Sequence, residues 1–345
     1  MALNICPQFL SGPVEQLISR VIEKAPTMTR KGSFKEVMNT YVPSVNHLGG
    51  MPNDISQELS IFVNNSCSID AVKNLKDGSN TCFTKRQLLH IVKEYNKKYP
   101  NDKIIGYSNA TKNQLWNALN DRLNNQCNVE WCWLDQNFLN NNPSKHSLES
   151  QFKPRGPDGA NDWLSTTNIS NAMRMYEKLY RGTFKFFGPV PIDFDVMIME
   201  IKNIDIIKLY NNGVRKIGFV FNLDPSHKSG SHWVAMYVDL EKGGVYYFDS
   251  YATSMGCPPD EIAALKDRLM SQITELFKLY GIRRKPVYAY NKTRFQRRNS
   301  ECGVYSMYFI LQMARGRSFV DVTNTIMMDE EIQQFRNVYF RPKYK

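Results

Sequence analysis

Four side chains in the C-terminal half of the sequence have the types and the order that nucleophilic catalysis by a thiol requires. His232 comes first, Asp249 follows 17 residues later, and Gln296 stands six residues before Cys302. A thiol is mostly protonated at neutral pH, so a cysteine nucleophile needs a base beside it. The set therefore predicts a site in which Cys302 attacks a carbonyl carbon and His232 is the base.

The elements that must position these side chains can be read from the surrounding residues. The stretch from Cys302 to about Arg315 is almost entirely apolar, which predicts a buried helix with the thiol in its first turn, at the positive end of the helix dipole. Residues 232–240 and 245–249 are rich in β-branched and aromatic residues, and a Gly-Gly pair separates them. They predict an antiparallel hairpin whose open end brings His232 and Asp249 together.

At the open end of this hairpin, Asp249 can orient the imidazole of His232 and stabilise its positive charge. Gln296 lies on the loop that leads into the helix, where its amide N–H₂ and the backbone N–H of Cys302 can hold an oxyanion. Asn299, three residues before Cys302, could share the oxyanion role with Gln296 and is a candidate for contact with the substrate. Asp239 is the rival carboxylate, but on a strand it faces away from His232 and lies near the turn.

The other histidines compete for the role of base. His227 lies in a loop rich in Gly, Ser and Pro, and we expect it to be solvated. We expect surface or packing positions for the remaining three, which are His47, His90 and His146.

The motifs around these residues resemble those of the SUMO-specific (Ulp-type) and adenovirus-type cysteine proteases. The matching segments are His232-Trp233, Phe248-Asp249-Ser250, and a glutamine six positions ahead of the cysteine in Glu301-Cys302-Gly303. The likeness is strongest to the viral members that process polyproteins, and it extends over residues 150–345. In the most similar of these the third triad position is asparagine, whereas this chain has Asp249, as the SUMO proteases do.

The resemblance implies an α+β fold, a permuted papain-like core at residues 151–345, and a triad of His232, Asp249 and Cys302 with Gln296 at the oxyanion. It also implies cleavage of viral structural polyproteins after Gly-Gly, at Gly-Gly-X sites, during virion maturation, in the host cytoplasm at the viral factory and in the virion. Trp233 would roof a narrow substrate cleft. The other candidates for its wall are Trp163, Tyr305, Phe186 and Phe187. Gly49-Gly50-Met51 has the form of such a cleavage site in the chain itself.

Composition limits the remaining classes of protein. The chain has 345 residues, of which 42% are hydrophobic, enough for one large core and a smaller module. We expect no membrane segment, because no apolar run approaches the ~18–20 residues needed to cross a bilayer. The seven cysteines form an odd, unpatterned set, which predicts reduced thiols. We expect no cofactor and no metal ion, since Cys127 and Cys132 lack a second ligand pair.

The net charge of +11 is concentrated around the predicted nucleophile. Residues 278–298 carry eight Lys or Arg side chains and no acid, and residues 336–345 add Arg336, Arg341, Lys343 and Lys345. One interpretation is a solvated surface that keeps the protein soluble. The other is a surface that binds nucleic acid, as adenovirus-type relatives do.

Residues 1–150 form a different kind of sequence, which predicts a mainly helical N-terminal arm. Residues 84–99 and 112–123 have apolar side chains at helical spacing, with Asn109 or Thr111 as the cap of the second helix. This arrangement at 83–124 loosely resembles SAP-like nucleic-acid-binding modules, and a plain helical arm packed on the core is the alternative. Residues 140–144 have the composition of a linker.

Three other functions fit the same residues. A deconjugating enzyme that acts on SUMO- or ubiquitin-like proteins would use the same site, and so would an acyltransferase. The third is a particle protein without enzymatic activity that binds nucleic acid.

Overall fold

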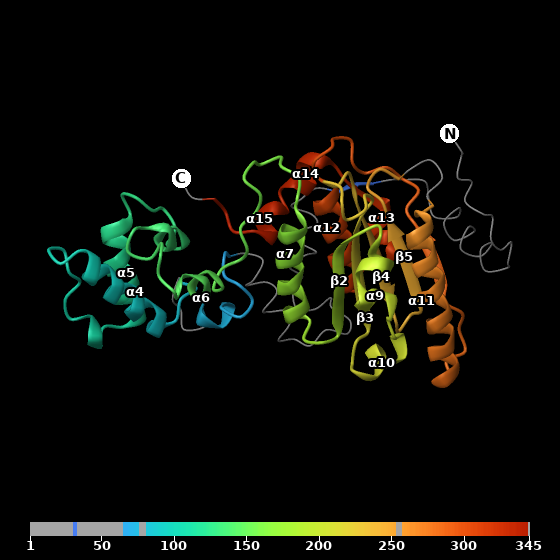
Figure 1. Ribbon diagram of the computed structural model, residues 1–345, viewed down its shortest axis with the longest axis horizontal. Helices are drawn as coiled ribbons and strands as arrows, with labels where there is room; N and C mark the ends of the chain where they lie inside the picture. The colour runs from blue at the N-terminus through green and yellow to red at the C-terminus, as the bar shows by residue number, and fades with distance from the viewer. Residues whose placement is uncertain (1–29, 33–64, 76–80, 253–256, 344–345) are drawn as a thin grey trace. The chain divides into compact units, whose positions relative to one another are not determined.

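The computed structural model describes residues 30–32, 65–75, 81–252 and 257–343, and these fall into two compact units (Figure 1). The core unit contains Pro157–Arg336, together with the short strand near residue 30. The arm unit contains the described residues from 65 to Gly156 and also the C-terminal segment that begins at Asn337. The chain therefore passes from one unit to the other three times: between the strand near residue 30 and residue 65, after Gly156 and after Arg336.

A five-stranded mixed sheet forms the centre of the core unit. Its order is β2-β3-β4-β5-β6, in which β2 pairs with β3 and β5 with β6 in parallel, whereas β3, β4 and β5 are antiparallel. All seven residues of β4 are buried, because helices cover both faces of the sheet. The strands are β2 (Phe184–Pro191), β3 (Lys216–Asn222), β4 (Trp233–Asp239), β5 (Gly244–Phe248) and β6 (Val287–Tyr290).

One face of the sheet packs against α12 (Cys302–Ala314), whose thirteen residues are all buried. Phe248 of β5 stacks on Phe309 of α12, with ring centroids 4.8 Å apart. Gly218 of β3 permits this close approach, since a Cβ there would lie 2.7 Å from Ile310. The predicted buried helix that begins at Cys302 is thus confirmed.

The other face of the sheet packs against α11 (Asp260–Leu279), which buries six apolar side chains. Apolar residues of the segment between β2 and β3 join the same cluster. That segment contains α8 (Phe194–Met197), α9 (Met199–Lys202) and α10 (Ile206–Asn211). Figure 1 shows α11 beside β5 and α10 below the sheet.

The remaining elements of the core unit frame these layers. The helix α7 (Thr166–Leu179) packs against β2. After α12 come α13 (Phe319–Asn324), β7 (Thr325–Met327), α14 (Asp329–Gln333) and α15 (Arg336–Tyr339). The strand β7 pairs in parallel with β1 (Arg30–Gly32).

Two helices of the arm unit begin where the sequence predicts them. α4 (Lys85–Lys98) and α5 (Lys112–Leu123) are each preceded by a threonine that forms a capping box, Thr84 with Gln87 and Thr111 with Gln114. Thr111, and not Asn109, is therefore the cap of the second helix. The other elements of this unit are η1 (Val72–Leu75), η2 (Tyr107–Asn109), η3 (Glu130–Asp135) and α6 (Lys145–Glu149).

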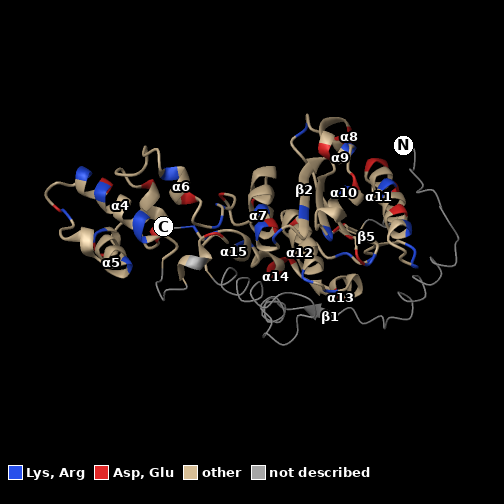
Figure 2. Ribbon diagram, turned by 90° about the horizontal axis from the view of Figure 1, so that it is seen from below, with Lys and Arg blue, Asp and Glu red and all other residues tan. Residues whose placement is uncertain are grey.

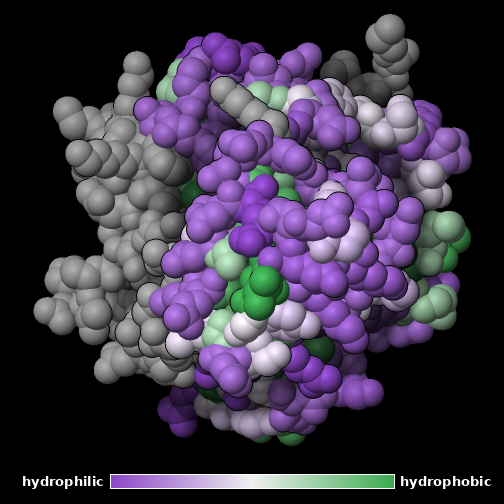
Figure 3. Space-filling view, turned by 90° about the vertical axis from the view of Figure 1, so that its left-hand side faces the viewer, coloured by the Kyte–Doolittle hydropathy of each residue, from purple (hydrophilic) through white to green (hydrophobic). Residues whose placement is uncertain are grey.

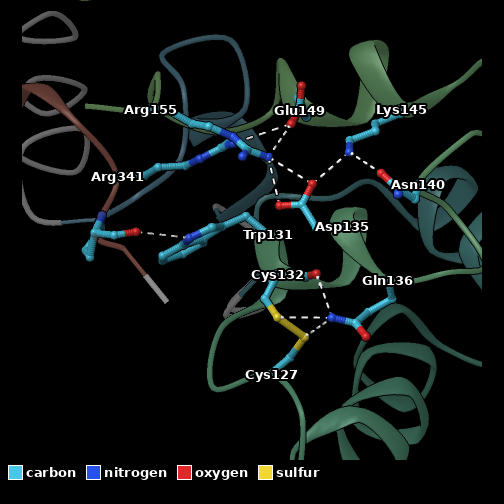
Figure 4. Close-up of polar contacts among 11 residues, drawn as sticks. Cys127, Trp131, Cys132, Asp135, Gln136, Asn140, Lys145, Glu149, Arg155 and Arg341 are labelled. Carbon is cyan, nitrogen blue, oxygen red and sulfur yellow. Dashed lines mark hydrogen bonds and ion pairs between the residues drawn. A yellow bond between two sulfur atoms is a disulfide. The ribbon is translucent and has the colours of Figure 1, made fainter. Parts of the chain in front are cut away.

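The prediction of reduced thiols is wrong for the arm unit. Cys67 is bonded to Cys82, and Cys127 is bonded to Cys132 (Figure 4). Cys257 is disulfide-bonded as well. Pairing depends on distance in space, and the Cα atoms of the two arm pairs lie 5.2 and 5.5 Å apart, which sequence spacing alone does not reveal.

Figure 3 shows one face of the molecule, which is largely hydrophilic, with a few hydrophobic residues among polar ones. No helix in the described part of the chain is long and apolar enough to span a bilayer. Gly49, Gly50, Met51 and His47 lie outside the described residues.

Candidate active site

The hairpin of β4 and β5 brings His232 and Asp249 together, as predicted. Ala235 pairs with Phe248, so the residue before β4 and the residue after β5 meet at the open end of the hairpin. His232 Nε2 lies 2.7 Å from Asp249 Oδ1, and both side chains are largely buried. This contact leaves the other ring nitrogen, Nδ1, for a second partner.

A buried asparagine that the sequence analysis did not identify holds Asp249 in place. Asn291 lies directly after β6; its Oδ1 accepts from Asp249 N at 2.9 Å and its Nδ2 donates to Asp249 O at 2.7 Å. The backbone N–H of Tyr251 donates to Asp249 Oδ1 at 2.9 Å. Asn291 thus fixes the backbone of Asp249, and Tyr251 N helps to orient its carboxylate. The one indication in the sequence that Asn291 could hold Asp249 is its position at the end of a strand.

Cys302 is the first residue of α12, and among the described cysteines it is the free one. Burial of the imidazole opposes its protonation, but hydrogen bonds with Asp249 and Cys302, and the charges of both, raise the pKa of His232 to about 9. The thiol is therefore a partner of the histidine.

Gln296 is fully buried, and its side-chain amide is fixed at one end and unsatisfied at the other. Oε1 accepts from the Ser250 hydroxyl at 2.7 Å, and the backbone N–H of Gln296 donates to Ser250 O at 2.9 Å. Nε2 is buried and has no hydrogen-bond partner among the described residues. A buried donor without an acceptor is costly, so it marks a position where an acceptor binds.

The loop between Gln296 and Cys302 is anchored from the C-terminal part of the core unit. Asp329 Oδ2 accepts from the backbone N–H groups of Arg297 and Arg298 at 2.9 and 2.8 Å. Arg336 forms a two-pronged ion pair with Glu301, with both N–O distances 3.0 Å. No pattern in the sequence indicates that Asp329 and Arg336 support the site.

Tyr251 is a further neighbour of the site that the sequence analysis missed. Its ring stacks on His232 with centroids 4.7 Å apart, and its hydroxyl donates to Arg298 O at 2.9 Å. The guanidinium of Arg294 lies 5.0 Å from the centre of the same ring. Tyr251 lies in the turn that follows β5, two residues after Asp249, and its contact with His232 depends on how that turn folds back.

The predicted substrate-binding residues lie in different environments. Trp233 is buried, and its Nε1 donates to Leu164 O at 2.9 Å, whereas the side chains of Trp163 and Asn299 are exposed. Tyr305 is fully buried on α12 and donates to Met327 O at 2.8 Å, so it is not available to a substrate. Phe186 and Phe187 are also buried.

The rival residues do not join the site. Asp239 Oδ1 accepts from the backbone N–H groups of Glu241 and Lys242, which places it in the turn at the opposite end of the hairpin. His227 and His146 are exposed, and His90 belongs to α4. In the described part of the chain no group of three or more His, Cys, Asp or Glu side chains is arranged to hold a metal ion.

Two of the four basic residues in segment 336–345 are paired with acidic residues and so do not add to a basic surface. Arg336 is paired with Glu301, and Arg341 lies 3.6 Å from Glu149; both arginines are buried. These pairings could not be predicted from the sequence, because each acidic residue precedes its arginine by more than 30 residues. The cations of segment 278–298 are exposed, and Figure 2 shows basic and acidic positions interspersed along the ribbon of α11, which leads into this segment.

The chain was compared with known proteins. Residues 217–345 match the Ulp1 protease family, C-terminal catalytic domain. A mimivirus protein (Acanthamoeba polyphaga mimivirus) with the name "Putative thiol protease" is 34% identical over 284 residues, which cover 76% of this chain and 90% of that protein. A "SUMO-1 cysteine protease" of African swine fever virus is 27% identical over 209 residues, which cover 56% of this chain and 73% of that protein.

A solved structure supports the fold assignment. The crystal structure of the selenomethionine form of the African swine fever virus protease matches with a TM-score of 0.56 and 23% identity, covering 70% of this chain and 94% of that chain. The predicted α+β protease fold is thereby confirmed. The matched family region contains all four candidate catalytic residues. The chain is a cysteine-type peptidase and belongs to the Ulp1 protease family.

Proposed function

We propose that this protein is a viral cysteine endopeptidase that cleaves structural polyproteins after Gly-Gly during virion maturation. The unpartnered amide of Gln296, buried beside the His232–Asp249 pair and the start of α12, is the observation that carries the proposal. It is the donor that an acyl-transfer site requires before the substrate arrives. The viral origin of the relatives supports a viral protein.

In the first step the Cys302 thiolate attacks the carbonyl carbon of the scissile peptide bond. The carbonyl oxygen becomes an oxyanion, which accepts hydrogen bonds from Gln296 Nε2 and from the backbone N–H of Cys302, free at the helix start. His232, protonated on the side facing the thiol, donates its proton to the leaving amine. The C–N bond breaks, and a thioester between Cys302 and the N-terminal product remains.

In the second step a water molecule hydrolyses the thioester. His232, now neutral, takes a proton from the water as the oxygen attacks, and the same two N–H donors hold the second oxyanion. Cys302 leaves as a thiolate and the imidazolium is restored. Asp249 stabilises that imidazolium throughout, because its Oδ1 stays 2.7 Å from Nε2.

Selectivity for Gly-Gly follows from a narrow approach to the thiol. Trp233 is fixed by its hydrogen bond to Leu164, and the neighbouring Trp163 is 43% exposed. We propose that these two indoles flank the substrate backbone and leave no room for side chains before the scissile bond. Asn299, exposed on the loop before Cys302, would contact the residues after it.

Peptide cleavage tests the proposal directly. Wild type and Cys302→Ala are incubated with peptides that carry Gly-Gly-X or Ala-Ala-X junctions, and the products are identified by mass spectrometry. Cleavage after Gly-Gly by the wild type alone is expected. Equal cleavage of both junctions would refute the specificity, and cleavage by Cys302→Ala would refute the nucleophile. A chain that starts at Met51, formed only by the wild type, would extend the same chemistry to self-processing.

A deconjugating activity is the second candidate function, and the name of the African swine fever virus relative, a SUMO-1 cysteine protease, favours it. It requires the same catalytic residues but a folded ubiquitin-like partner. The two functions are separated by giving the enzyme a SUMO conjugate and a polyprotein fragment together. Faster conversion of the conjugate would favour deconjugation.

Nucleic acid is a proposed partner through segment 278–298, whose exposed cations include Arg283, Arg284 and Lys285. Segment 336–345 contributes little to this surface, because its two arginines are buried in ion pairs. Binding there would hold the enzyme where its substrates are packed, in the viral factory of the host cytoplasm and in the virion. A particle protein that binds nucleic acid without cleaving any peptide is the remaining alternative, and the peptide assay separates it from the protease.

A further inference from the structure

The hydrogen bond with Asp249 fixes one atom of the His232 ring but not the plane of that ring. Nε2 lies 2.7 Å from Asp249 Oδ1, and this single contact leaves the imidazole free to turn about it. Proton transfer requires the other nitrogen, Nδ1, to point at the Cys302 thiol. A second contact is therefore needed to hold the imidazole in one plane.

The ring of Tyr251 makes that contact. It stacks on the imidazole with the ring centroids 4.7 Å apart and an angle of 29° between the ring planes. Aromatic rings attract each other at this separation, and the electron-rich face of a tyrosine also attracts a protonated imidazole. Because turning the imidazole out of its plane would break the stack, Asp249 and Tyr251 together fix the direction of Nδ1.

Tyr251 is itself held by the loop that leads to Cys302. Its hydroxyl donates to Arg298 O at 2.9 Å, and the guanidinium of Arg294 lies 5.0 Å from the centre of its ring. Arg294 Nε donates to Gln296 O at 2.7 Å, so this guanidinium is attached to the same loop. Burial, and after it the charge of Cys302, raise the pKa of the Tyr251 hydroxyl, which therefore stays protonated as a donor.

The backbone beside Tyr251 has an unfavourable conformation. Ala252 has a φ of 44°, in the left-handed region that residues with a Cβ rarely adopt. The turn is closed by Ala252 N, which donates to Asp249 O at 2.9 Å, and by Tyr251 N, which donates to Asp249 Oδ1 at 2.9 Å. Strained residues persist only where the surrounding contacts enforce them, and they are concentrated at functional sites. In this turn the enforced conformation accompanies the placement of the Tyr251 ring on His232.

We infer that Tyr251 is a positioning residue for the catalytic base: its ring fixes the plane of the His232 imidazole, and its hydroxyl ties that ring to the loop before Cys302. The inference rests on the proposed catalytic role of His232. Tyr251 acts through His232, since no step of the reaction uses its hydroxyl. Asp249 thus supplies the charge that stabilises the imidazolium, and Tyr251 supplies its orientation.

Three substitutions and a matched control test this role. Tyr251→Leu and Tyr251→Met remove the ring and the hydroxyl, whereas Tyr251→Phe keeps the stacked ring. Tyr210→Leu is the control, because the half-buried Tyr210 stacks on Tyr280 with centroids 5.1 Å apart and has the Arg215 guanidinium 3.9 Å from its ring centre. It belongs to α10, which leads into the start of β3, at the end of the sheet opposite to the active site.

Peptide cleavage separates positioning from substrate binding. We expect Tyr251→Leu and Tyr251→Met to lower kcat about 10-fold or more, with KM within about twofold, since a small misplacement of the base lowers rate and not affinity. Tyr251→Phe should retain most of the wild-type kcat, because the ring is still present. Tyr210→Leu should leave both constants unchanged. Thermal unfolding of each variant gives a temperature at which all are folded, and the assays are run there.

Alkylation of Cys302 by iodoacetamide gives a second measurement that needs no substrate. A base held at the thiol takes up its proton and speeds the reaction, so His232→Gln defines the rate without the base. Tyr251→Leu should react more slowly than the wild type, toward the rate of His232→Gln, while Tyr251→Phe and Tyr210→Leu should react as the wild type does.

A wild-type kcat and a wild-type alkylation rate in Tyr251→Leu would overturn the inference, and so would a loss in Tyr251→Phe or Tyr210→Leu as large as that in Tyr251→Leu. If the wild type cleaves no peptide in a Cys302-dependent manner, the proposed function fails. The alkylation rates would still show whether Tyr251 holds His232 at the thiol, so the two failures are distinguishable.

Discussion

Replacing Asp249 by asparagine separates the charge of the carboxylate from its role in orienting His232. The side-chain oxygen of asparagine can still accept from His232 Nε2 and from Tyr251 N, which lie 2.7 and 2.9 Å from Oδ1. The negative charge, however, is lost. Burial then opposes protonation of the imidazole with less to offset it, so we expect the pKa of His232 to fall by about 2 or more.

The size of this effect follows from the wild-type value. Folding raises the pKa of His232 from 6.5 to about 9, which corresponds to about 3 kcal/mol at about 1.36 kcal/mol per pKa unit. Because the folded value is the higher one, this contribution to the free energy of unfolding is fully present below pH 6.5. It is lost as the pH rises through about 9. In Asp249→Asn the loss should disappear from this pH range.

Proton NMR of the imidazole C–H signals measures the titration. The signal of His232 is the one missing from His232→Gln, and its midpoint should be near pH 9 in the wild type and at least about 2 lower in Asp249→Asn. Asp239→Asn is the control, since that buried carboxylate lies at the other end of the hairpin and binds Glu241 N and Lys242 N. A midpoint in Asp249→Asn within about half a pH unit of the wild type would refute the assignment of the charge effect to Asp249.

Three further predictions concern groups around the site and the arm unit. Gln296→Ala should lower kcat roughly 10²-fold with little change in KM, measured by steady-state peptide cleavage, because one oxyanion donor is removed; an unchanged kcat would exclude it from that role. Asn291→Ala removes two hydrogen bonds to the backbone of Asp249 and should lower the free energy of unfolding, measured by urea titration, by about 2 kcal/mol. Its peptidase activity should also be reduced at temperatures where the variant is fully folded. Replacing both Cys67 and Cys82 by serine opens a loop with a sequence separation of 15 and should lower the free energy of unfolding by about 3 kcal/mol. A melting temperature equal to that of the oxidised wild type would contradict a stabilising disulfide.

Local patterns in the sequence were sufficient for the elements that carry the candidate triad. The apolar run after Cys302 predicts the buried helix, and the Gly-Gly pair between two β-rich segments predicts the hairpin that joins His232 to Asp249. Helical spacing and a threonine cap likewise predict α4 and α5 in the arm unit. These features depend on residues within about 20 positions of one another, where backbone geometry alone limits what can meet.

The tertiary structure decided everything that depends on long-range packing. Tyr305 has the residue type of a cleft wall, yet its position on α12 buries it, and an apolar sequence alone does not show which of its side chains could reach a substrate. The pairings of Cys67 with Cys82 and of Glu301 with Arg336 could not be read from spacing, because chain packing sets distances between distant segments. Gln296 shows both contributions. Its offset from Cys302 is a property of the sequence, but only packing buries its side chain, joins Oε1 to Ser250 and leaves Nε2 without an acceptor among the described residues.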